Sequence, residues 1–346
     1  MIRPFRSCCV AALLCALAPA AHAATVYVAN NGLDGATCGA KASPCRSITR
    51  AIANAVAGDN VVVGPGRYAG ETGAPGCNCF VAVNKRVVLT SSDGAASTVI
   101  DAERFQVGQN VLVTADRSVV GRPKKGFTVL NAGGAGSTGI RIDADDVTVE
   151  GNQVVGTSHA FDPDLDVGLP TAPGVGILVV AGHPTPTLVQ GNQVMSWDTG
   201  IDASGATSVS KNQVSLNAVG IDVKETSSAT GNVVTGNFTG ILPQDSSRVA
   251  GNAVSGNPFD GIEVSGGFAG TITGNNIVGN GGTYSLNCGL YNLNAVHGLV
   301  AANNYWGAAT GPGPDPADAL CDFPAGLTTA TPFATKPFKV KAPILP

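Results

Sequence analysis

Carboxylates recur at one spacing in the second half of the chain and are the residues best suited to chemistry. Asp202 and Asp222 each follow a Gly-Ile pair and stand twenty residues apart, with Asp198 and Lys224 close by. Side chains alternate along a strand, so an inward Ile leaves the following Asp facing outward. Two carboxylates on neighbouring strands raise each other's pKa and suit acid–base catalysis, assisted by Lys224, or Ca²⁺ binding. The alternative is a solvated face on which Lys224 neutralises them.

The same outward position on other repeats offers candidates for substrate binding. It carries Arg141 and Glu263, which join Asp198 as candidate substrate contacts. Trp197, Phe238 and Phe259 precede Gly-Ile pairs at one corner, and aromatic rings suit stacking on sugar faces. Packing beneath that corner is an equally good interpretation of the three rings.

A second polar group lies between Ser158 and Pro173. We consider His159 and Asp162 as catalytic candidates, and the alternating Asp162, Asp164 and Asp166 as Ca²⁺ ligands. Loops on a rigid scaffold commonly carry function. The other histidines are scattered, which disfavours a compact site for any other metal.

A period of twenty residues organises these candidates. Relative to a recurring Asn, apolar residues stand three positions before and two after, and the Ile of each Gly-Ile pair forms a third column. Three apolar columns predict three short strands per coil, and therefore three parallel sheets around one stacked core. The predicted fold is an all-β solenoid over residues 61–310, with regular coils over 139–307.

The asparagines themselves form two columns. Asn tolerates the left-handed backbone of a sharp turn, and its amide can bond to the next coil. Repeated in every coil, such bonds predict a ladder that satisfies otherwise unpaired backbone groups. We therefore interpret both columns as structural. The first comprises Asn152, Asn192, Asn212, Asn232, Asn252, Asn275 and Asn303, and the second Asn217, Asn237, Asn257 and Asn280.

Two insertions interrupt the period, and the second lies around Thr283 to Asn287. At the first, Asn152 and Asn192 are forty residues apart, but only one Gly-Ile pair, at Ile177, lies between them. The extra length therefore predicts a loop insertion at 158–173 rather than an additional coil.

An amphipathic helix is predicted at 47–57, within a cap region of 24–60. Ile48, Ala51, Ile52, Ala55 and Val56 share one face, and Ser47 and Gly58 supply the start and stop signals. Such a cap covers the open apolar end of a solenoid.

Both ends of the chain resemble known β-helix proteins. The helix, with Gly58-Asp59 and the run from Pro65 to Tyr68, resembles the N-terminal cap of right-handed parallel β-helix proteins of the pectin-lyase-like superfold. The run Asn303-Asn304-Tyr305-Trp306-Gly307, with the Pro-rich closing segment 311–346, resembles the end of bacterial proteins related to the periplasmic NosD group. The resemblance implies a single-stranded right-handed parallel β-helix with a short N-terminal capping helix.

The first 23 residues have the features of a signal peptide. Arg3 and Arg6 precede an apolar run, and Ala21-His22-Ala23 is a cleavage signal, so an exported protein, extracellular or periplasmic, is predicted. Six cysteines remain, and disulfides are expected in an oxidising compartment. Cys77 and Cys79 are too close to bond easily with each other, so each is expected to pair elsewhere or one to stay free; Cys288 and Cys321 are expected to tie down the C-terminal segment. The other two cysteines are Cys38 and Cys45.

Charge and hydropathy narrow the classes of partner that this protein can bind. Without Arg3 and Arg6, 18 Lys and Arg stand against 24 Asp and Glu, which argues against a nucleic-acid partner. No segment after the leader is long and apolar enough to cross a bilayer. A monomer that engages a polysaccharide is predicted, with Ca²⁺ as the one cofactor that the carboxylates suggest.

Local resemblances to sugar-acting enzymes are partial. Phe161-Asp162-Pro163 resembles an element of mannuronan C5-epimerases, but Asp164 and His159 replace that family's catalytic His and Tyr. Asp145-Asp146 and Gly182-His183-Pro184 are similar to polygalacturonase motifs, whose Asn-Thr-Asp and Arg-Ile-Lys companions are absent. Two hypotheses remain. The chain binds, and as a lyase, hydrolase or epimerase processes, an extracellular or cell-envelope polysaccharide; alternatively, it is a non-catalytic scaffold, adhesion module or NosD-like periplasmic accessory protein.

Overall fold

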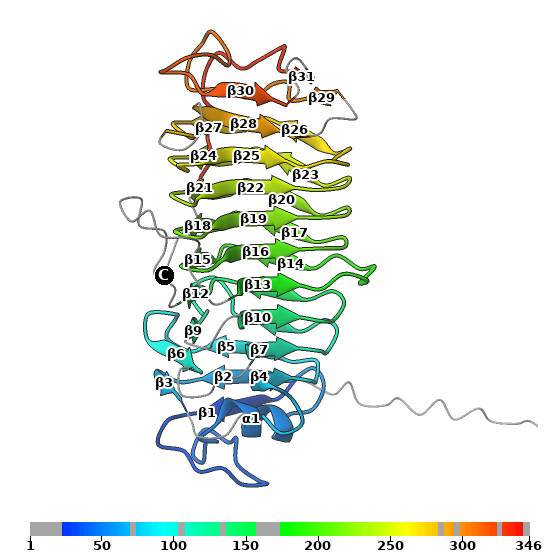
Figure 1. The fold of residues 1–346 in the computed structure, drawn as a ribbon. Helices are drawn as coiled ribbons and strands as arrows, with labels where there is room; N and C mark the ends of the chain where they lie inside the picture. The colour runs from blue at the N-terminus through cyan, green and yellow to red at the C-terminus, as the bar shows by residue number, and fades with distance from the viewer. Residues whose placement is uncertain are drawn as a thin grey trace, which may run out of the picture.

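Parallel strands wind into one solenoid with a single short helix in the described chain (Figure 1). The computed structural model describes residues 23–69, 74–102, 108–131, 136–156, 174–282, 287–293, 298–323 and 327–341. The candidates His159, Asp162, Asp164 and Asp166 lie outside the described residues, as does nearly all of the predicted signal peptide. No helix in the described part of the chain is long and apolar enough to span a membrane.

Three parallel sheets run the length of the solenoid, and each coil visits them in the same order. Sheet 1 contains β1 (Thr25–Val28), β2 (Asn60–Val63), β5 (Val88–Ser91), β8 (Val119–Val120), β11 (Thr148–Glu150), β14 (Leu188–Gln190), β17 (Ser208–Ser210), β20 (Ser228–Thr230), β23 (Arg248–Ala250) and β26 (Thr271–Thr273). Sheet 2 contains β3 (Gly66–Tyr68), β6 (Thr98–Asp101), β9 (Thr128–Asn131), β12 (Gln153–Gly156), β15 (Gln193–Met195), β18 (Gln213–Ser215), β21 (Val233–Thr235), β24 (Ala253–Ser255) and β27 (Asn276–Val278).

Sheet 3 faces the viewer in Figure 1 and carries the Gly-Ile pairs. It contains β4 (Cys79–Val83), β7 (Gln109–Val113), β10 (Thr138–Ile142), β13 (Val175–Val179), β16 (Thr199–Ala203), β19 (Val219–Val223), β22 (Thr239–Pro243), β25 (Asp260–Val264), β28 (Cys288–Asn292) and β30 (Ala319–Asp322). A short pair, β29 (Leu299–Val300) and β31 (Thr328–Thr329), lies at the C-terminal end. The predicted all-β, right-handed parallel β-helix is confirmed.

The apolar columns stack in register and form the core. Val189 pairs with Val209, Val194 with Val214, and Ile201 with Ile221, and all six side chains are fully buried. β11 pairs directly with β14, and β12 with β15, so no coil intervenes across the forty-residue interval. Residues far apart in sequence therefore become neighbours on one face.

Both predicted asparagine ladders are present and buried. The amide nitrogen and Nδ2 of Asn212 donate to Oδ1 of Asn232 at 2.9 and 3.1 Å. Asn232 Nδ2 in turn donates to the Val209 carbonyl and to Asn252 Oδ1, both at 2.9 Å. The prediction for the last coil is wrong by one residue, because Asn304 rather than Asn303 accepts from Asn275. Each rung satisfies backbone groups at a corner that the sheets leave unpaired.

Space, rather than backbone conformation, explains the glycine of each Gly-Ile pair. A Cβ on Gly220 would lie 2.5 Å from the Gly240 carbonyl oxygen and 2.9 Å from both Asn237 Nδ2 and Val234 Cγ1. The corner between sheets 2 and 3 therefore requires glycine so that the ladder and the core can meet.

Asp318 ends the second ladder. Its two carboxylate oxygens accept hydrogen bonds from the Gly279 and Asn280 amides and from Asn280 Nδ2, at 2.6 to 3.1 Å. The side chain is buried, and burial raises the pKa of Asp318 despite those hydrogen bonds. An aspartate has no N–H with which to continue the ladder.

The capping helix α1 (Ile48–Asn54) is shorter than predicted. Ser47 is its N-cap, and Lys85 Nζ donates to the Ala53 and Ala55 carbonyls at its C-terminus, where a cation is favourable. Ala55 already has an extended backbone, so Val56 turns outward and is 70% exposed. The prediction that Val56 faces the core is therefore wrong.

Disulfides join all six cysteines of the described chain. Cys38 bonds to Cys45, and Cys288 to Cys321, which fastens the last sheet 3 strands together. Cys77 bonds to Cys79, contrary to the expectation that each would pair elsewhere. The turn between them brings their Cα atoms to 5.2 Å, within the range that a disulfide spans.

We predict that Asn232→Ala destabilises the protein by roughly 2 to 4 kcal/mol, because it leaves the Asn212 donors and the Val209 carbonyl unsatisfied in the core. Urea unfolding followed by circular dichroism measures the change. Thr230→Ala, on the outward face of the same coil, is the control and should change stability little. Equal effects from both substitutions would contradict the ladder's role.

Asp318 predicts a specific pH dependence of stability. Its folded pKa lies above the ordinary 3.8, so its stabilising contribution is complete below that value and is lost as the pH rises through the raised pKa. The stability of the wild type relative to Asp318→Asn should therefore fall as the pH increases from about 4 to neutral. A rising difference, measured by urea unfolding at each pH, would refute this assignment.

Candidate functional site

Asp202, Asp222 and Lys224 meet on the outward face of sheet 3. Asp202 and Asp222 are register partners on β16 and β19. Lys224 Nζ lies 2.8 and 2.9 Å from the two oxygens of Asp202 and 2.9 Å from Asp222 Oδ2. The predicted carboxylate pair and the predicted neutralising lysine are thus one arrangement, in which the ammonium bridges two carboxylates, and the face is not fully solvated because Asp222 is only 8% exposed.

Gln244 extends this group by one coil. Its Nε2 donates to Asp222 Oδ1 at 2.9 Å, so both Asp222 oxygens have a partner. Lys224 and Gln244 each reach back to the preceding coil in the same diagonal manner, because the coil repeat places them identically. We call Asp202, Asp222, Lys224 and Gln244 the polar row.

Burial and charge act in opposite directions within the polar row. Burial raises the pKa of Asp222, while Lys224 and Gln244 lower it in part and the Asp202 charge adds to the rise. Burial alone would lower the pKa of Lys224, but its hydrogen bonds to Asp202 and Asp222 and their charges outweigh burial and raise it. Lys224 therefore stays protonated at neutral pH and is unsuited to act as a general base.

The three predicted stacking aromatics do not share one environment. Phe238 and Phe259 are half-buried and stacked, with ring centroids 4.6 Å apart and planes 12° from parallel. Trp197 is 1% exposed, and its Nε1 donates to the Val154 carbonyl, so the prediction that it contacts a sugar is wrong. Its backbone N–H donates to Asn217 Oδ1, so Trp197 occupies the coil where the second ladder begins. Its position twenty residues before Asn217 is the signal that could have placed it.

The remaining predicted contacts flank the polar row. Asp198 and Glu263 are half-buried, and burial raises the pKa of each. Arg141 lies on β10, two coils before β16, with a guanidinium nitrogen 3.8 Å from Asp143. Arg141 is therefore separated from the polar row by β13, whose outward residue is Leu178.

A second polar cluster was not predicted as a site. His183 Nε2 lies 3.2 Å from Asp143, its Nδ1 lies 3.7 Å from Asp145, and Thr185 Oγ1 donates to Asp145 at 2.7 Å. The two hydrogen bonds from Thr185 lower the pKa of Asp145. These residues lie forty positions apart, so the absence of an extra coil in that interval is the signal that brings them together.

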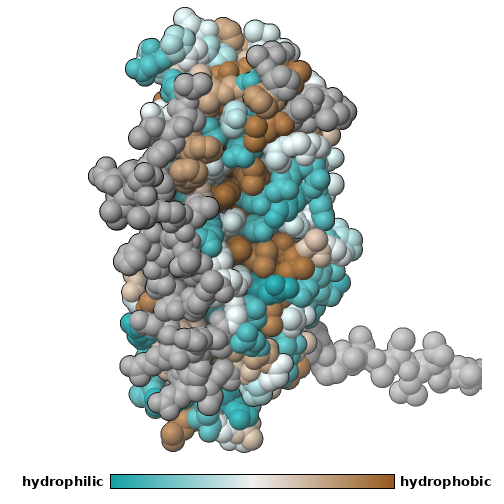
Figure 2. Space-filling model, viewed as in Figure 1, coloured by the Kyte–Doolittle hydropathy of each residue, from teal (hydrophilic) through white to brown (hydrophobic). Residues whose placement is uncertain are grey.

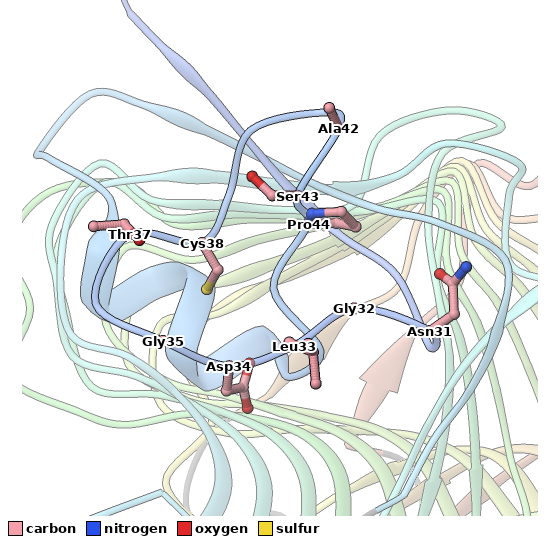
Figure 3. Close-up of a pocket in the computed structure, with 10 residues that line it drawn as sticks. All are labelled: Asn31, Gly32, Leu33, Asp34, Gly35, Thr37, Cys38, Ala42, Ser43 and Pro44. Atoms are coloured by element: carbon pink, nitrogen blue, oxygen red, sulfur yellow. The ribbon is translucent and has the colours of Figure 1, made fainter.

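Among the described residues, the one compact group of metal-ligand types is Asp34, Cys38 and Cys45. The two cysteines form a disulfide, and Asp34 accepts the Arg46 and Ser47 amides before α1. A nearby depression is lined only by the loop 31–44 (Figure 3). This group is part of the cap, because disulfide sulfurs are not thiolate ligands. The predicted Ca²⁺ ligands Asp162, Asp164 and Asp166 lie outside the described residues.

Solved structures share this architecture. A pectate lyase, Pel9A, has a TM-score of 0.55 and 14% identity, covering 90% of this chain and 78% of its own. A rhamnogalacturonan lyase has a TM-score of 0.49 and 12% identity, covering 91% and 87%. A mannuronan C-5 epimerase module from Azotobacter vinelandii has a TM-score of 0.32 and 13% identity, covering 81% and 89%. At these sequence identities the similarity shows a shared fold and nothing more. Among these three structures, the pectate lyase alone has a TM-score above 0.5, so the structural comparison rests on it.

The chain is a right-handed parallel β-helix of the pectin-lyase-like kind. Residues 177–309 match a family model described as periplasmic copper-binding protein (NosD), and residues 30–75 match one described as a protein of unknown function (DUF1565). The first match contains the polar row, and the second contains α1. No curated protein matches the chain in sequence.

We predict that Lys224→Met lowers the free energy of unfolding by roughly 1 to 3 kcal/mol near neutral pH, because two partly buried carboxylates lose their cation. The loss should shrink at about pH 4, since a carboxyl with a raised folded pKa is stabilising when protonated and loses this contribution as the pH rises. Urea unfolding at both pH values measures it. Lys211→Met, at an exposed lysine, is the control; equal loss at both pH values would contradict the bridge.

Proposed function

We propose that the outward face of sheet 3 binds a polysaccharide outside the cytoplasm. The observation that carries this proposal is the polar row, held by mutual hydrogen bonds on β16 and β19 and at the residues that follow β19 and β22, with the stacked Phe238 and Phe259 directly before β22 and β25 of the same sheet. Figure 2 shows hydrophilic residues gathered over these strands above a hydrophobic patch at the level of β13. A sugar has hydroxyls for the polar groups and an apolar face for the rings.

Preorganisation supports binding on this face. Each member of the polar row is held by another member, so little side-chain freedom is lost when a ligand arrives. Carboxylate oxygens accept more than one hydrogen bond each, so Asp202, which is half-buried, retains capacity for sugar hydroxyls, whereas Asp222 is 8% exposed and holds Lys224 in place. A sheet of ten strands in the described chain also offers a long surface, which suits a polymer.

The disulfides are consistent with a location outside the cytoplasm, where the proposed polysaccharide would be found. Three disulfides in the described chain indicate an oxidising environment, which the periplasm and the cell exterior provide. The predicted signal peptide would deliver the protein there.

Processing of the bound polymer is the second candidate function. Asp222 has a raised pKa and lies beside the Asp202 carboxylate, an arrangement that suits a proton donor next to a charge-stabilising group. Lys224, as a retained cation, would stabilise negative charge rather than remove a proton. His159 and Asp162 remain candidates for the base in the predicted loop.

A copper site is not supported by the described residues of the matched range. His183 is the single histidine among them, and both of its ring nitrogens face carboxylates. Met195 lies on sheet 2, whereas His183 lies between sheets 3 and 1. Because copper prefers imidazole and sulfur ligands gathered at one place, this donor set does not fit it. A non-catalytic accessory role without copper remains the alternative to glycan binding.

We predict that Phe259→Ala weakens polysaccharide binding roughly 3- to 10-fold, the value of one lost stacking contact. Affinity electrophoresis across neutral, acidic and amino polysaccharides measures it, and Leu188→Ala on sheet 1 is the control. Assays for new reducing ends and unsaturated products decide between binding and processing, and a processing activity should be lost in Asp222→Asn. Absence of binding to every polymer would refute the proposal.

A further inference from the structure

Charge on the sheet 3 face restricts which polysaccharide it can take. The outward residues around β16, β19 and β25 include four carboxylates, from Asp198, Asp202, Asp222 and Glu263, and one cation, Lys224. With all five groups ionised, the described part of this surface has a formal net charge of −3. A bound polymer is therefore placed against a negative surface.

Lys224 is already committed to its own protein. An ammonium group has three donors, and Lys224 Nζ makes three contacts of 2.8 to 2.9 Å with Asp202 and Asp222. Arg141, the cation two coils away, faces Asp143. Lys224 is therefore not available to a carboxylate on an incoming sugar without first giving up a carboxylate of the protein, and Arg141 lies two coils from Asp202, beyond Leu178 on β13.

A uronate polymer is disfavoured by this arrangement. It carries one carboxylate per residue, and a sugar bound along this face would place those carboxylates close to Asp202 or Glu263, at distances on the order of the 4.8 Å strand spacing. Like charges at such distances repel by about 1 kcal/mol in water and by more in a partly buried site. Protonated amines on a polymer would instead find carboxylate partners, at Asp202 on β16 and at Glu263 on β25, with Leu242 of β22 between Asp222 and Glu263.

Resting on the proposed function, we infer that the sheet 3 face selects glycans with free amino groups, such as partly deacetylated amino-sugar polymers, over uronate polymers. Asp202, Asp198 and Glu263, which are only half-buried, accept the amines, and Phe238 and Phe259 contact the apolar ring face. Lys224 fixes Asp202 in position against the buried Asp222. The polar row then recognises positively charged groups on the polymer.

The test compares three oligosaccharide sets of matched length by isothermal titration calorimetry: glucosamine oligomers, the same oligomers after chemical N-acetylation, and galacturonate oligomers. Titrations use mildly acidic buffer with EDTA, at low and at physiological salt. The glucosamine oligomers should bind most tightly and weaken with salt, and N-acetylation should reduce their affinity. Galacturonate oligomers should bind least.

Asp202→Asn supplies a second measurement, because it removes one carboxylate and partly releases Lys224. Glucosamine affinity should fall roughly two- to fivefold, and galacturonate affinity should rise. Glu150→Gln makes the same charge change on sheet 1 and should alter neither. The N-acetylation comparison requires no variant, so the inference stays testable if Asp202→Asn fails to fold.

The possible failures are distinct. Tighter binding of galacturonate, with EDTA or only when Ca²⁺ is supplied, would overturn the amine inference and leave the proposed function standing. Equal affinity before and after N-acetylation would also overturn it. Failure of all three sets, together with every polymer tested above, would overturn the proposed function itself.

Discussion

Unpaired backbone groups at the buried corners are the constraint on which this solenoid depends. Sheets satisfy the backbone within strands, but each coil must turn three times, and a buried turn without partners costs as much as a lost hydrogen bond for every group. Asparagine solves this at two corners, because one side chain accepts from the preceding coil and donates both back to that coil and on to the next. The requirement recurs in every coil, so the ladder keeps the strands in register even where a coil is longer than twenty residues, as between Asn152 and Asn192 or Asn252 and Asn275.

Regularity explains which features could be predicted from the sequence. The Val, Ile and Asn columns repeat, so a single register argument placed the core, the ladders and the Asp202–Asp222 pair. Errors arose where no repeat constrains the chain: the early exit of Val56 from α1, the Cys77–Cys79 turn, and the shift from Asn303 to Asn304 in the last coil. Trp197 was misplaced for a related reason, since a large apolar residue at the start of a ladder column can be a core residue.

The sequence predicted where the candidate site lies but not how its side chains are paired. Register alone brought Asp202 and Asp222 together, whereas the reach of Lys224 and Gln244 across coils depends on side-chain conformations that no spacing specifies. Predicting the His183 cluster from the sequence would have required knowing that the forty residues between Asp143 and His183 correspond to a single coil. The outward face is thus a surface where single substitutions alter charge without disturbing the ladders beneath.

Along each ladder, the Asn Nδ2 groups donate to the Asn of the next coil toward the C-terminus, and most, like that of Asn232, also donate back to a carbonyl of the preceding coil. Such a stack would otherwise end in exposed donors, against which another solenoid could dock end to end and grow into a fibre. At the second ladder, Asp318 receives the last donors and has none to pass on. A single carboxylate thus leaves the second ladder with no free donor to offer an end-to-end partner, and the first ladder ends likewise at Asn304, whose Nδ2 is bonded to the Ile272 and Ala301 carbonyls.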